Sequence, residues 1–250
     1  MPLQEELEEQ GQWLFKYRGV IPVFIFVIGF GLYVYMKYNP DKFYFEETDF
    51  ENVWFYLCFG ISLFGLLIRV ITIGATPPNT SGRNTKEQVA DTLNTKGLYS
   101  IVRHPLYLGN FFMWLGPAML LENFWFLIAF VFLFMLYYER IMFAEEQFLR
   151  RKFGERYLNW ATRTPAFFPS FKNFEKTQLI FCWKKVLKNE KTGIMLLFVV
   201  FAVMHVTGQL IQKKGSYDFL IIGLGIVSIL YYVVVKIISK QTNLLNVAHR

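Results

Sequence analysis

The chain has 250 residues, of which 54% are hydrophobic and 19% aromatic, and its formal net charge is +7. A soluble domain of this length carries more charge and more turn-forming residues, so the composition excludes an ordinary soluble domain and indicates a membrane protein. The basic residues flank apolar runs and form no groove interleaved with aromatic side chains. The positive charge therefore predicts contact with anionic lipid head groups and not with nucleic acid.

The polar start, residues 1–19, is expected on the cytoplasmic membrane surface, with Trp13, Phe15 and Tyr17 in the interface. No small-residue cleavage site follows it, so no cleavable signal peptide is expected. Further along, runs long enough to cross about 30 Å of hydrocarbon occur at 20–37, 54–74, 124–142, 192–211 and 219–237.

A sixth apolar run, Pro105 to Leu121, is short and turns at Glu122 and Asn123, which predicts a tight helical hairpin with the next span. Lys and Arg gather in the loops 76–103 and 145–191, whereas the loop 40–52 is acidic. Because basic loops stay on the cytoplasmic side, we expect an all-α, polytopic integral membrane helical bundle of about six spans with both termini cytoplasmic.

The distribution of polar segments predicts four parts. They are an N-terminal segment with the first span (1–53), a core that carries the motifs below (54–170), a basic interfacial linker helix (171–191) and a C-terminal transmembrane hairpin with a tail (192–250). Within the linker, Phe174 to Lys188 mixes Lys with apolar residues, as a helix lying in the interface does. In the hairpin, His205 and Gln209 share a helix face, which favours interhelical hydrogen bonding over acceptor recognition.

The first motif is GLYSIVRHPLYLGNFF, residues 97–112. Pro105 suits the first turn of a helix, so Arg103 and His104 are expected at a helix N-terminus. The partial positive charge of that N-terminus and the charge of Arg103 favour binding of a carboxylate or phosphate. Tyr107 lies on the same helix, and Gly109 leaves room for a ligand or a neighbouring helix. The alternative is a cytoplasmic Arg before a helix-starting Pro, with the aromatic residues as ordinary core.

The second motif is ERIMFAEEQFLRRKFG, residues 139–154. Glu139 and Glu146 are seven apart on one helix face, and a carboxylate here suits a cationic ligand such as a sulfonium. The alternative is a solvated helix end with pairs such as Glu146 to Arg150. That alternative explains Arg150 well, but it does not explain Glu139 and Arg140 at the end of an apolar run. Charged groups at the edge of hydrocarbon indicate a functional site.

Together, RHPLYLG, EEQFL and FGERYLNW with Pro165 and Pro169 resemble the RHPxYxG and EExxL signatures of the membrane-embedded isoprenylcysteine carboxyl methyltransferase and phospholipid methyltransferase superfamily. The resemblance covers residues 54–170. It implies a helical S-adenosylmethionine site on the cytoplasmic side, with a cofactor-binding set of Arg103, His104, Tyr107, Gly109, Glu145 and Glu146. The catalytic residues that it implies are Glu145 and Arg140, and Arg140 is one position out of register with the family's substrate-side arginine.

The resemblance implies methyl transfer to a lipid. Arg140 and the basic surface from Arg150 to Lys191 favour a phosphate or carboxylate oxygen as acceptor. Within the superfamily, the chain most resembles the bacterial branch that methylates the lipid A 1-phosphate. That resemblance implies a site that faces the cytoplasm from the bacterial inner membrane. The alternatives are an amine N-methyltransferase, a reductase using NADPH as sterol reductases do, and a non-catalytic lipid-binding or scaffold protein. Leu106 departs from the reductase pattern RHPNY.

Several sites are not expected. No glycine-rich turn follows a strand pattern, which excludes a soluble Rossmann-type cofactor domain. Neither a Ser/His/Asp spacing nor a metal-ligand spacing is present. Cys58 and Cys182 lie in different kinds of segment, so they predict packing as small apolar side chains and neither a disulfide framework nor a metal site.

Overall fold

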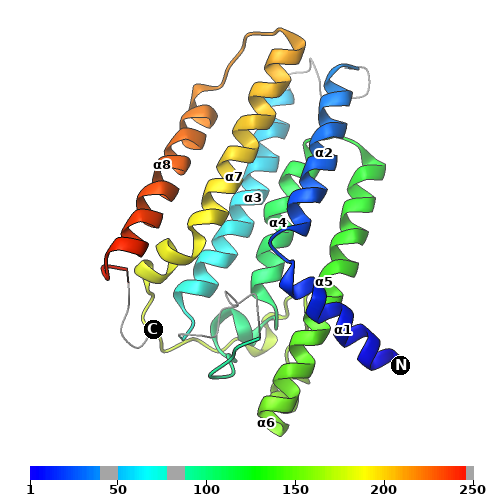
Figure 1. The fold of residues 1–250 in the computed structure, drawn as a ribbon, viewed down its shortest axis with the longest axis vertical. Helices are drawn as coiled ribbons and strands as arrows, with labels where there is room; N and C mark the ends of the chain where they lie inside the picture. The colour runs from blue at the N-terminus through cyan, green and yellow to red at the C-terminus, as the bar shows by residue number, and fades with distance from the viewer. Residues whose placement is uncertain (40–49, 78–87, 246–250) are drawn as a thin grey trace.

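A computed structural model describes residues 1–39, 50–77 and 88–245, and this part of the chain contains helices and no strands. The α-helices are α1 (Leu3–Lys16), α2 (Ile21–Lys37), α3 (Glu51–Gly74), α4 (Pro105–Met119), α5 (Phe124–Phe153), α6 (Glu155–Ala161), α7 (Trp183–Gln212) and α8 (Phe219–Gln241), with short 3-10 turns η2 (Gly97–Ser100) and η3 (Phe171–Asn173). Their arrangement confirms the all-α membrane bundle (Figure 1).

Four of the described helices, α3, α5, α7 and α8, are long and apolar enough to cross a bilayer. The pair α1 and α2 adds a fifth candidate span, bent by 73° at the break between the two helices. The remaining element of the six-span prediction is α4, whose 15 residues fall short of a full crossing. The apolar runs thus predicted the positions of the helices. Both α5 and α7 continue as helix beyond their apolar runs, through several polar residues.

The closest helix pair is α3 and α4, and small residues make it possible. A Cβ on Gly116 would lie 2.2 Å from the Ser62 hydroxyl oxygen, and one on Gly65 would lie 2.5 Å from the Gly109 carbonyl oxygen. Ser62 also donates a hydrogen bond to the Met113 carbonyl at 3.0 Å. Backbones that approach this closely in a membrane gain van der Waals contact, so α3 holds α4 in a fixed rotation.

The predicted tight connection between α4 and α5 is confirmed, because α5 begins at Phe124 with the Asn123 side chain accepting a hydrogen bond from the Phe126 amide. At its other end α5 stops at Gly154, whose φ of 52° lies in the left-handed region that favours glycine. The chain reverses there and α6 starts at once, which returns residues 162–170 toward the start of α4 (Figure 1).

The predicted interfacial helix over 174–188 is wrong. Residues 174–182 form no helix, and α7 runs without interruption from Trp183 into the membrane span. Tertiary hydrogen bonds replace the helical ones: the Glu175 carbonyl accepts from the Gly97 amide at 2.8 Å, and the Cys182 amide donates to the Gly74 carbonyl at 2.9 Å. The segment is therefore an extended strap that ties η2 and the end of α3 to α7.

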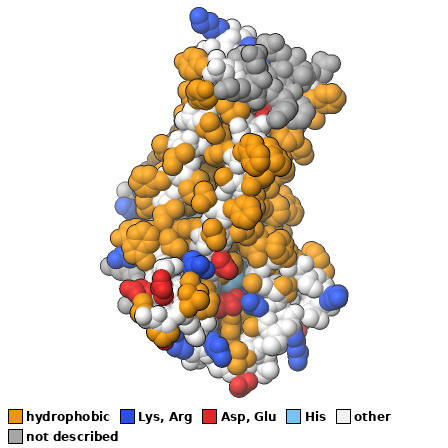
Figure 2. Space-filling view, turned by 90° about the vertical axis from the view of Figure 1, so that its right-hand side faces the viewer, with side chains coloured by type: hydrophobic (Ala, Val, Ile, Leu, Met, Phe, Trp, Pro, Cys, Tyr) orange, Lys and Arg blue, Asp and Glu red, His pale blue; other side chains and the backbone are white. Residues whose placement is uncertain are grey.

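Helices α1 and α6, the start of α7 and the end of α8 lie at one end of the bundle (Figure 1). On the face drawn in Figure 2, apolar side chains cover most of the length, and most charged side chains gather near that same end. Trp13 and Tyr17 are exposed there as expected, but Phe15 is buried against the core. Most of the predicted acidic loop at 40–52 lies outside the described residues.

Candidate functional site

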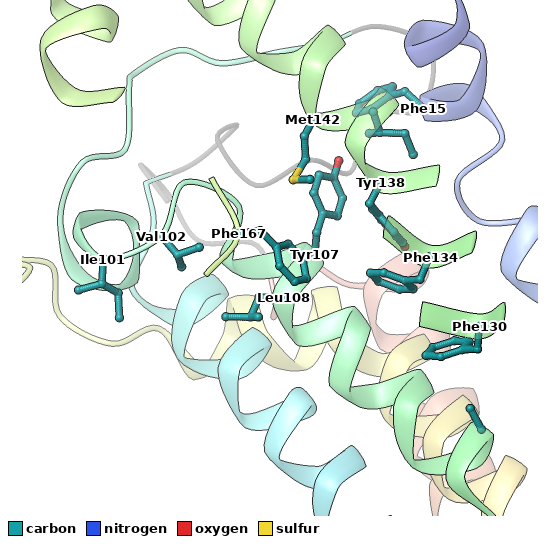
Figure 3. Packing of buried hydrophobic residues seen from close by; sticks show 12 residues of the cluster. Phe15, Ile101, Val102, Tyr107, Leu108, Phe130, Phe134, Tyr138, Met142 and Phe167 are labelled. Atoms are coloured by element: carbon teal, nitrogen blue, oxygen red, sulfur yellow. The ribbon is translucent and has the colours of Figure 1, made fainter. Parts of the chain in front are cut away.

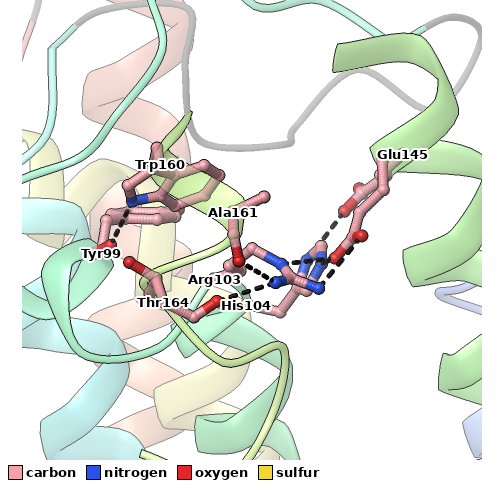
Figure 4. A network of polar contacts seen from close by, with 8 residues as sticks. Tyr99, Arg103, His104, Glu145, Trp160, Ala161 and Thr164 are labelled. Atoms are coloured by element: carbon pink, nitrogen blue, oxygen red, sulfur yellow. Dashed lines mark hydrogen bonds and ion pairs between the residues drawn. The ribbon is translucent and has the colours of Figure 1, made fainter. Parts of the chain in front are cut away.

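The first motif is held in place by backbone hydrogen bonds from the segment that follows α6. The Arg103 amide donates to the Pro165 carbonyl at 2.8 Å and the His104 amide to the Ala166 carbonyl at 3.2 Å. Pro105 opens α4, and His104 precedes it with non-helical backbone angles, as the sequence predicts. The two side chains are thus fixed at the N-terminus of α4, facing the C-terminal half of α5 (Figure 4).

Arg103 binds protein groups on three sides. Its Nε donates to Glu146 Oε1 at 2.8 Å, its Nη2 to Glu146 Oε2 at 3.2 Å, and its Nη1 to the carbonyls of Ala161 and Thr164 at 2.8 and 2.7 Å (Figure 4). It therefore joins α4, α5 and the end of α6, where its charge also suits the helix C-terminus. Glu146 faces Arg103 and does not line the cavity described below, which contradicts its expected contact with the cofactor.

His104 lies between the two carboxylates, and its side chain is 6% exposed. Its Nε2 is 2.9 Å from Glu146 Oε1 and its Nδ1 is 3.5 Å from Glu145 Oε2. Burial alone would lower the pKa of this imidazole, but hydrogen bonds and charge from Glu145 and Glu146 outweigh burial, and the pKa is raised above 6.5. The site therefore favours a cationic His104 between two anionic neighbours.

Glu145 is the carboxylate that the site presents to a ligand. Its Oε1 accepts a hydrogen bond from the Tyr107 hydroxyl at 2.6 Å. Tyr107 stacks with the His104 ring at a centroid distance of 5.7 Å and lies 4.7 Å from the Tyr138 ring. Apolar side chains pack around Tyr107, among them Tyr138, Met142 and Phe167 (Figure 3).

These residues open onto a cavity of about 910 Å³. Its polar end is lined by Arg103, His104, Tyr107 and Glu145, and its back wall is one face of α4, formed by Leu106, Asn110, Met113, Trp114 and Pro117. The start of α2 and the first half of α7 flank that wall. Pockets of a few hundred to about 1,000 Å³ bind most of the surface of a cofactor-sized molecule. The cavity is therefore large enough for a nucleoside cofactor with part of a second substrate.

Two predicted site residues lie elsewhere. Gly109 faces α3, where a Cβ would lie 2.6 Å from Arg69 Cγ, so the room that it leaves is filled by a neighbouring helix and not by the cofactor. Arg140 is outside the cavity, pairs with the exposed Glu139 at 3.2 Å, and lies on the α5 face that Gly11 of α1 covers. Because Arg140 and Glu145 are five residues apart, a helix turns them to different faces.

The sequence analysis missed a buried ion pair at the floor of the cavity. Arg69 of α3 donates through Nε and Nη2 to Glu190 of α7 at 2.7 and 2.6 Å, and the Glu190 side chain is 1% exposed. Arg69 Nη1 donates to Asn110 Oδ1 at 2.6 Å, and Asn110 Nδ2 to the Tyr138 hydroxyl at 3.1 Å. A lone Arg in the apolar run 54–74 is the signal that would have found it.

At the far end of α7, His205 and Gln209 bind the loop that joins α7 to α8. His205 Nε2 accepts from the Asp218 amide at 2.8 Å and Gln209 Oε1 from the Ser216 amide at 3.2 Å. Neither residue lines the cavity. The predicted interhelical hydrogen bonds are therefore wrong for both residues, because their partners are backbone amides of the connecting loop and not groups of the facing helix.

Comparisons with known proteins match part of the chain. Residues 56–156 match the phospholipid methyltransferase family model. The chain is 34% identical over 119 residues to protein-S-isoprenylcysteine O-methyltransferase B of Arabidopsis thaliana (44% of this chain, 59% of that protein) and 37% identical over 78 residues to the Schizosaccharomyces pombe protein-S-isoprenylcysteine O-methyltransferase (31% and 33%).

The chain is also 37% identical over 102 residues to the nickel-cobalt-cadmium resistance protein NccN of Alcaligenes xylosoxydans xylosoxydans (40% of this chain, 45% of that protein). The chain thus covers between a third and three fifths of these three relatives. No solved structure matches it. The matched segment contains α4, α5 and every residue of the Arg103, His104, Glu145 and Glu146 network. In this segment the chain is similar to the phospholipid methyltransferase family and to isoprenylcysteine O-methyltransferases.

Proposed function

We propose that this protein is a membrane methyltransferase that uses S-adenosylmethionine and modifies a lipid. The observation that carries the proposal is the orientation of Glu145, whose carboxylate lines the cavity while Tyr107 and His104 hold it in place. When bound, S-adenosylmethionine would supply an electrophilic methyl group on a sulfonium. A fixed carboxylate beside aromatic faces suits that cation, because both stabilise positive charge without donating a proton.

The residues of the site orient the reactants and carry out little proton transfer. Glu145 and the rings of Tyr107 and Tyr138 would hold the cationic end of the cofactor. Arg103 and Glu146 fix the start of α4 against α5, so the partial positive charge of the α4 N-terminus and the remaining polar wall would hold its carboxylate. Alignment of the acceptor atom with the methyl group then accounts for most of the rate enhancement.

The acceptor proposed here is an anionic oxygen of a lipid, a phosphate or a carboxylate. Among the described residues, five cationic side chains and one carboxylate line the cavity: Arg18, Arg69, Arg103, Lys185, Lys188 and Glu145. Glu190 and Glu146 pair with Arg69 and Arg103, which leaves Arg18, Lys185 and Lys188 against Glu145. This net positive lining favours an anionic head group over the neutral or cationic amine of an N-methyltransferase. An acceptor of the lipid A 1-phosphate type in a bacterial inner membrane, with the site facing the cytoplasm, remains the specific form of this proposal.

Cofactor titration tests the first part. Calorimetry of the protein in nanodiscs should show saturable binding of S-adenosylmethionine and none of NADPH. Glu145→Gln removes the negative charge and should weaken that binding by about 1–4 kcal/mol, the Coulomb energy of two unit charges about 4 Å apart at effective dielectric constants of roughly 80 to 20. Glu139→Gln is the matched control, because Glu139 lies on the same helix with its side chain 62% exposed. NADPH binding without S-adenosylmethionine binding would favour the reductase alternative.

A second measurement tests the acceptor. Lipid extracts from a strain that lacks the gene should contain an anionic lipid that is lighter by one methyl group than in the parent strain. Complementation with the wild-type gene should restore the heavier species, and Glu145→Gln should not. An unchanged set of anionic lipids together with altered amine lipids would reverse the choice of acceptor.

A further inference from the structure

The break between α1 and α2 places an arginine at the mouth of the cavity. Arg18 lies between Lys16, where α1 ends, and Ile21, where α2 begins, and it lines the cavity together with Pro22 and Val23. The 73° bend turns α1 away from the bundle axis at this point. The break lies toward the end of the bundle where α6 lies (Figure 1), and a cation there suits the depth of lipid head groups.

Phe15 holds the Arg18 side chain in one position. The guanidinium carbon lies 3.7 Å from the centroid of the Phe15 ring, and Nη1 donates to the Phe15 carbonyl at 3.0 Å. Phe15 is itself only 5% exposed, so its ring is fixed by the core. A stacked guanidinium loses little conformational freedom on binding, and its planar edge suits two oxygens of a phosphate or carboxylate.

An apolar cleft meets the cavity beside Arg18. This cleft, of about 50 Å³, lies between α2, α4 and α5 and has an almost wholly apolar lining that includes Phe26, Phe130 and Phe134. Pro22, Trp114, Pro117 and Tyr138 line both spaces, so the cleft is adjacent to the cavity. Tyr107, Tyr138 and Glu145 line the same cavity as Arg18.

We propose that Arg18 binds the anionic head group of the lipid acceptor while apolar groups next to that head group lie against the adjoining cleft. This inference deepens the proposed function and rests on it, because the bound lipid is an acceptor only if the protein transfers a methyl group. The assignment adds to the site a residue outside the matched segment 56–156 and replaces Arg140, which lies outside the cavity. Specificity for an anionic lipid then comes from the N-terminal helices, which pack against the segment that carries the two motifs.

Lipid binding in detergent tests this directly. Native mass spectrometry should show that dioleoylphosphatidic acid binds the wild type more tightly than dioleoylphosphatidylcholine does. Arg18→Ala should weaken binding of the phosphatidic acid about tenfold, which corresponds to about 1.4 kcal/mol, and leave phosphatidylcholine binding unchanged. Arg18→Lys should recover part of the loss, and Arg140→Ala should bind both lipids as the wild type does. Thermal melting confirms that each variant is folded.

Cofactor titration of the same variants separates this inference from the proposed function. Arg18→Ala should keep wild-type affinity for S-adenosylmethionine and, in methyl transfer from labelled cofactor into the lipid extract, raise the apparent KM for lipid. Loss of cofactor affinity in Arg18→Ala, or an unchanged preference for phosphatidic acid, would overturn the role of Arg18. Failure of the wild type to bind S-adenosylmethionine would overturn the proposed function alone, because the Arg18-dependent lipid binding would still stand.

Discussion

At the scale of single residues, the site depends on two adjacent glutamates that do different things. Glu146 is turned inward to Arg103 and His104, whereas Glu145 lines the cavity. The motif alone predicted that Arg103, His104, Tyr107 and Glu145 come together, and the structure places all four at one end of the cavity. It did not separate Glu145 from Glu146, because which carboxylate turns inward depends on Arg103, which is 43 positions away from Glu146 in the sequence.

The raised pKa of His104 predicts a pH-dependent stability. A folded-state pKa above the unfolded value of about 6.5 means that His104 stabilises the fold fully below that value and loses this contribution as the pH rises through the folded pKa. Replacement of Glu146 by Gln removes a partner that raises the pKa. The fall in melting temperature between mildly acidic and alkaline pH should therefore be smaller in Glu146→Gln than in the wild type.

Circular dichroism melts of both proteins in detergent, taken across this pH range, measure the effect. Glu139→Gln is again the control and should keep the wild-type pH profile, since Glu139 is exposed and paired with Arg140. An identical profile in Glu146→Gln and the wild type would show that the pKa of His104 does not depend on Glu146.

At the scale of elements, hydropathy predicted the spans well, because a bilayer selects long apolar helices whatever their neighbours are. The strap at 174–182 shows where this reasoning fails. Its apolar and basic residues suit an interfacial helix, but the Gly97 amide and the Gly74 carbonyl provide backbone partners that only the folded chain brings together. Arg140 fails in a similar way, since its neighbours in sequence do not reveal that α1 covers its face of α5.

The pairing of α3 with α7 gives a prediction about the C-terminal hairpin. Because Arg69 and Glu190 are buried together, Glu190→Ala should leave an uncompensated charge and destabilise the protein by about 3–5 kcal/mol. The double change Arg69→Met with Glu190→Leu should recover most of that stability, since apolar side chains of similar volume often replace a buried pair without loss. Thermal melts of the single and double variants measure how much stability is lost and how much is recovered. Equal melting temperatures for Glu190→Ala and the wild type would show that the pair does not tie α7 to α3.

At the scale of the whole molecule, three parts of the chain build one cavity. The matched segment supplies Glu145 and its partners, the α1–α2 break supplies Arg18, and α7 supplies one wall with Lys185 and Lys188 at its polar end. Lys185 also donates to the Thr76 and Pro77 carbonyls at 2.8 and 2.7 Å, so α7 fixes the end of α3 as well. The hairpin outside the matched segment therefore contributes to the cavity and does not only anchor the chain.

The orientation of the molecule follows from where its charges lie, and it gives the last prediction. The strap carries Gln178 and the α7–α8 loop carries Ser216, and both residues are exposed at opposite ends of α7. Basic segments stay on the cytoplasmic side, so the strap and the cavity should face the cytoplasm and Ser216 the other side.

A membrane-impermeant maleimide added to intact cells tests this in a Cys182→Ser background, where the remaining Cys58 is fully buried. Cysteine introduced as Ser216→Cys should react, whereas Gln178→Cys should react only after the membrane is permeabilised. The reverse pattern would place the cavity on the outer side. A cytoplasmic S-adenosylmethionine pool would then not reach Glu145, so this outcome would contradict the orientation and the proposed cofactor together.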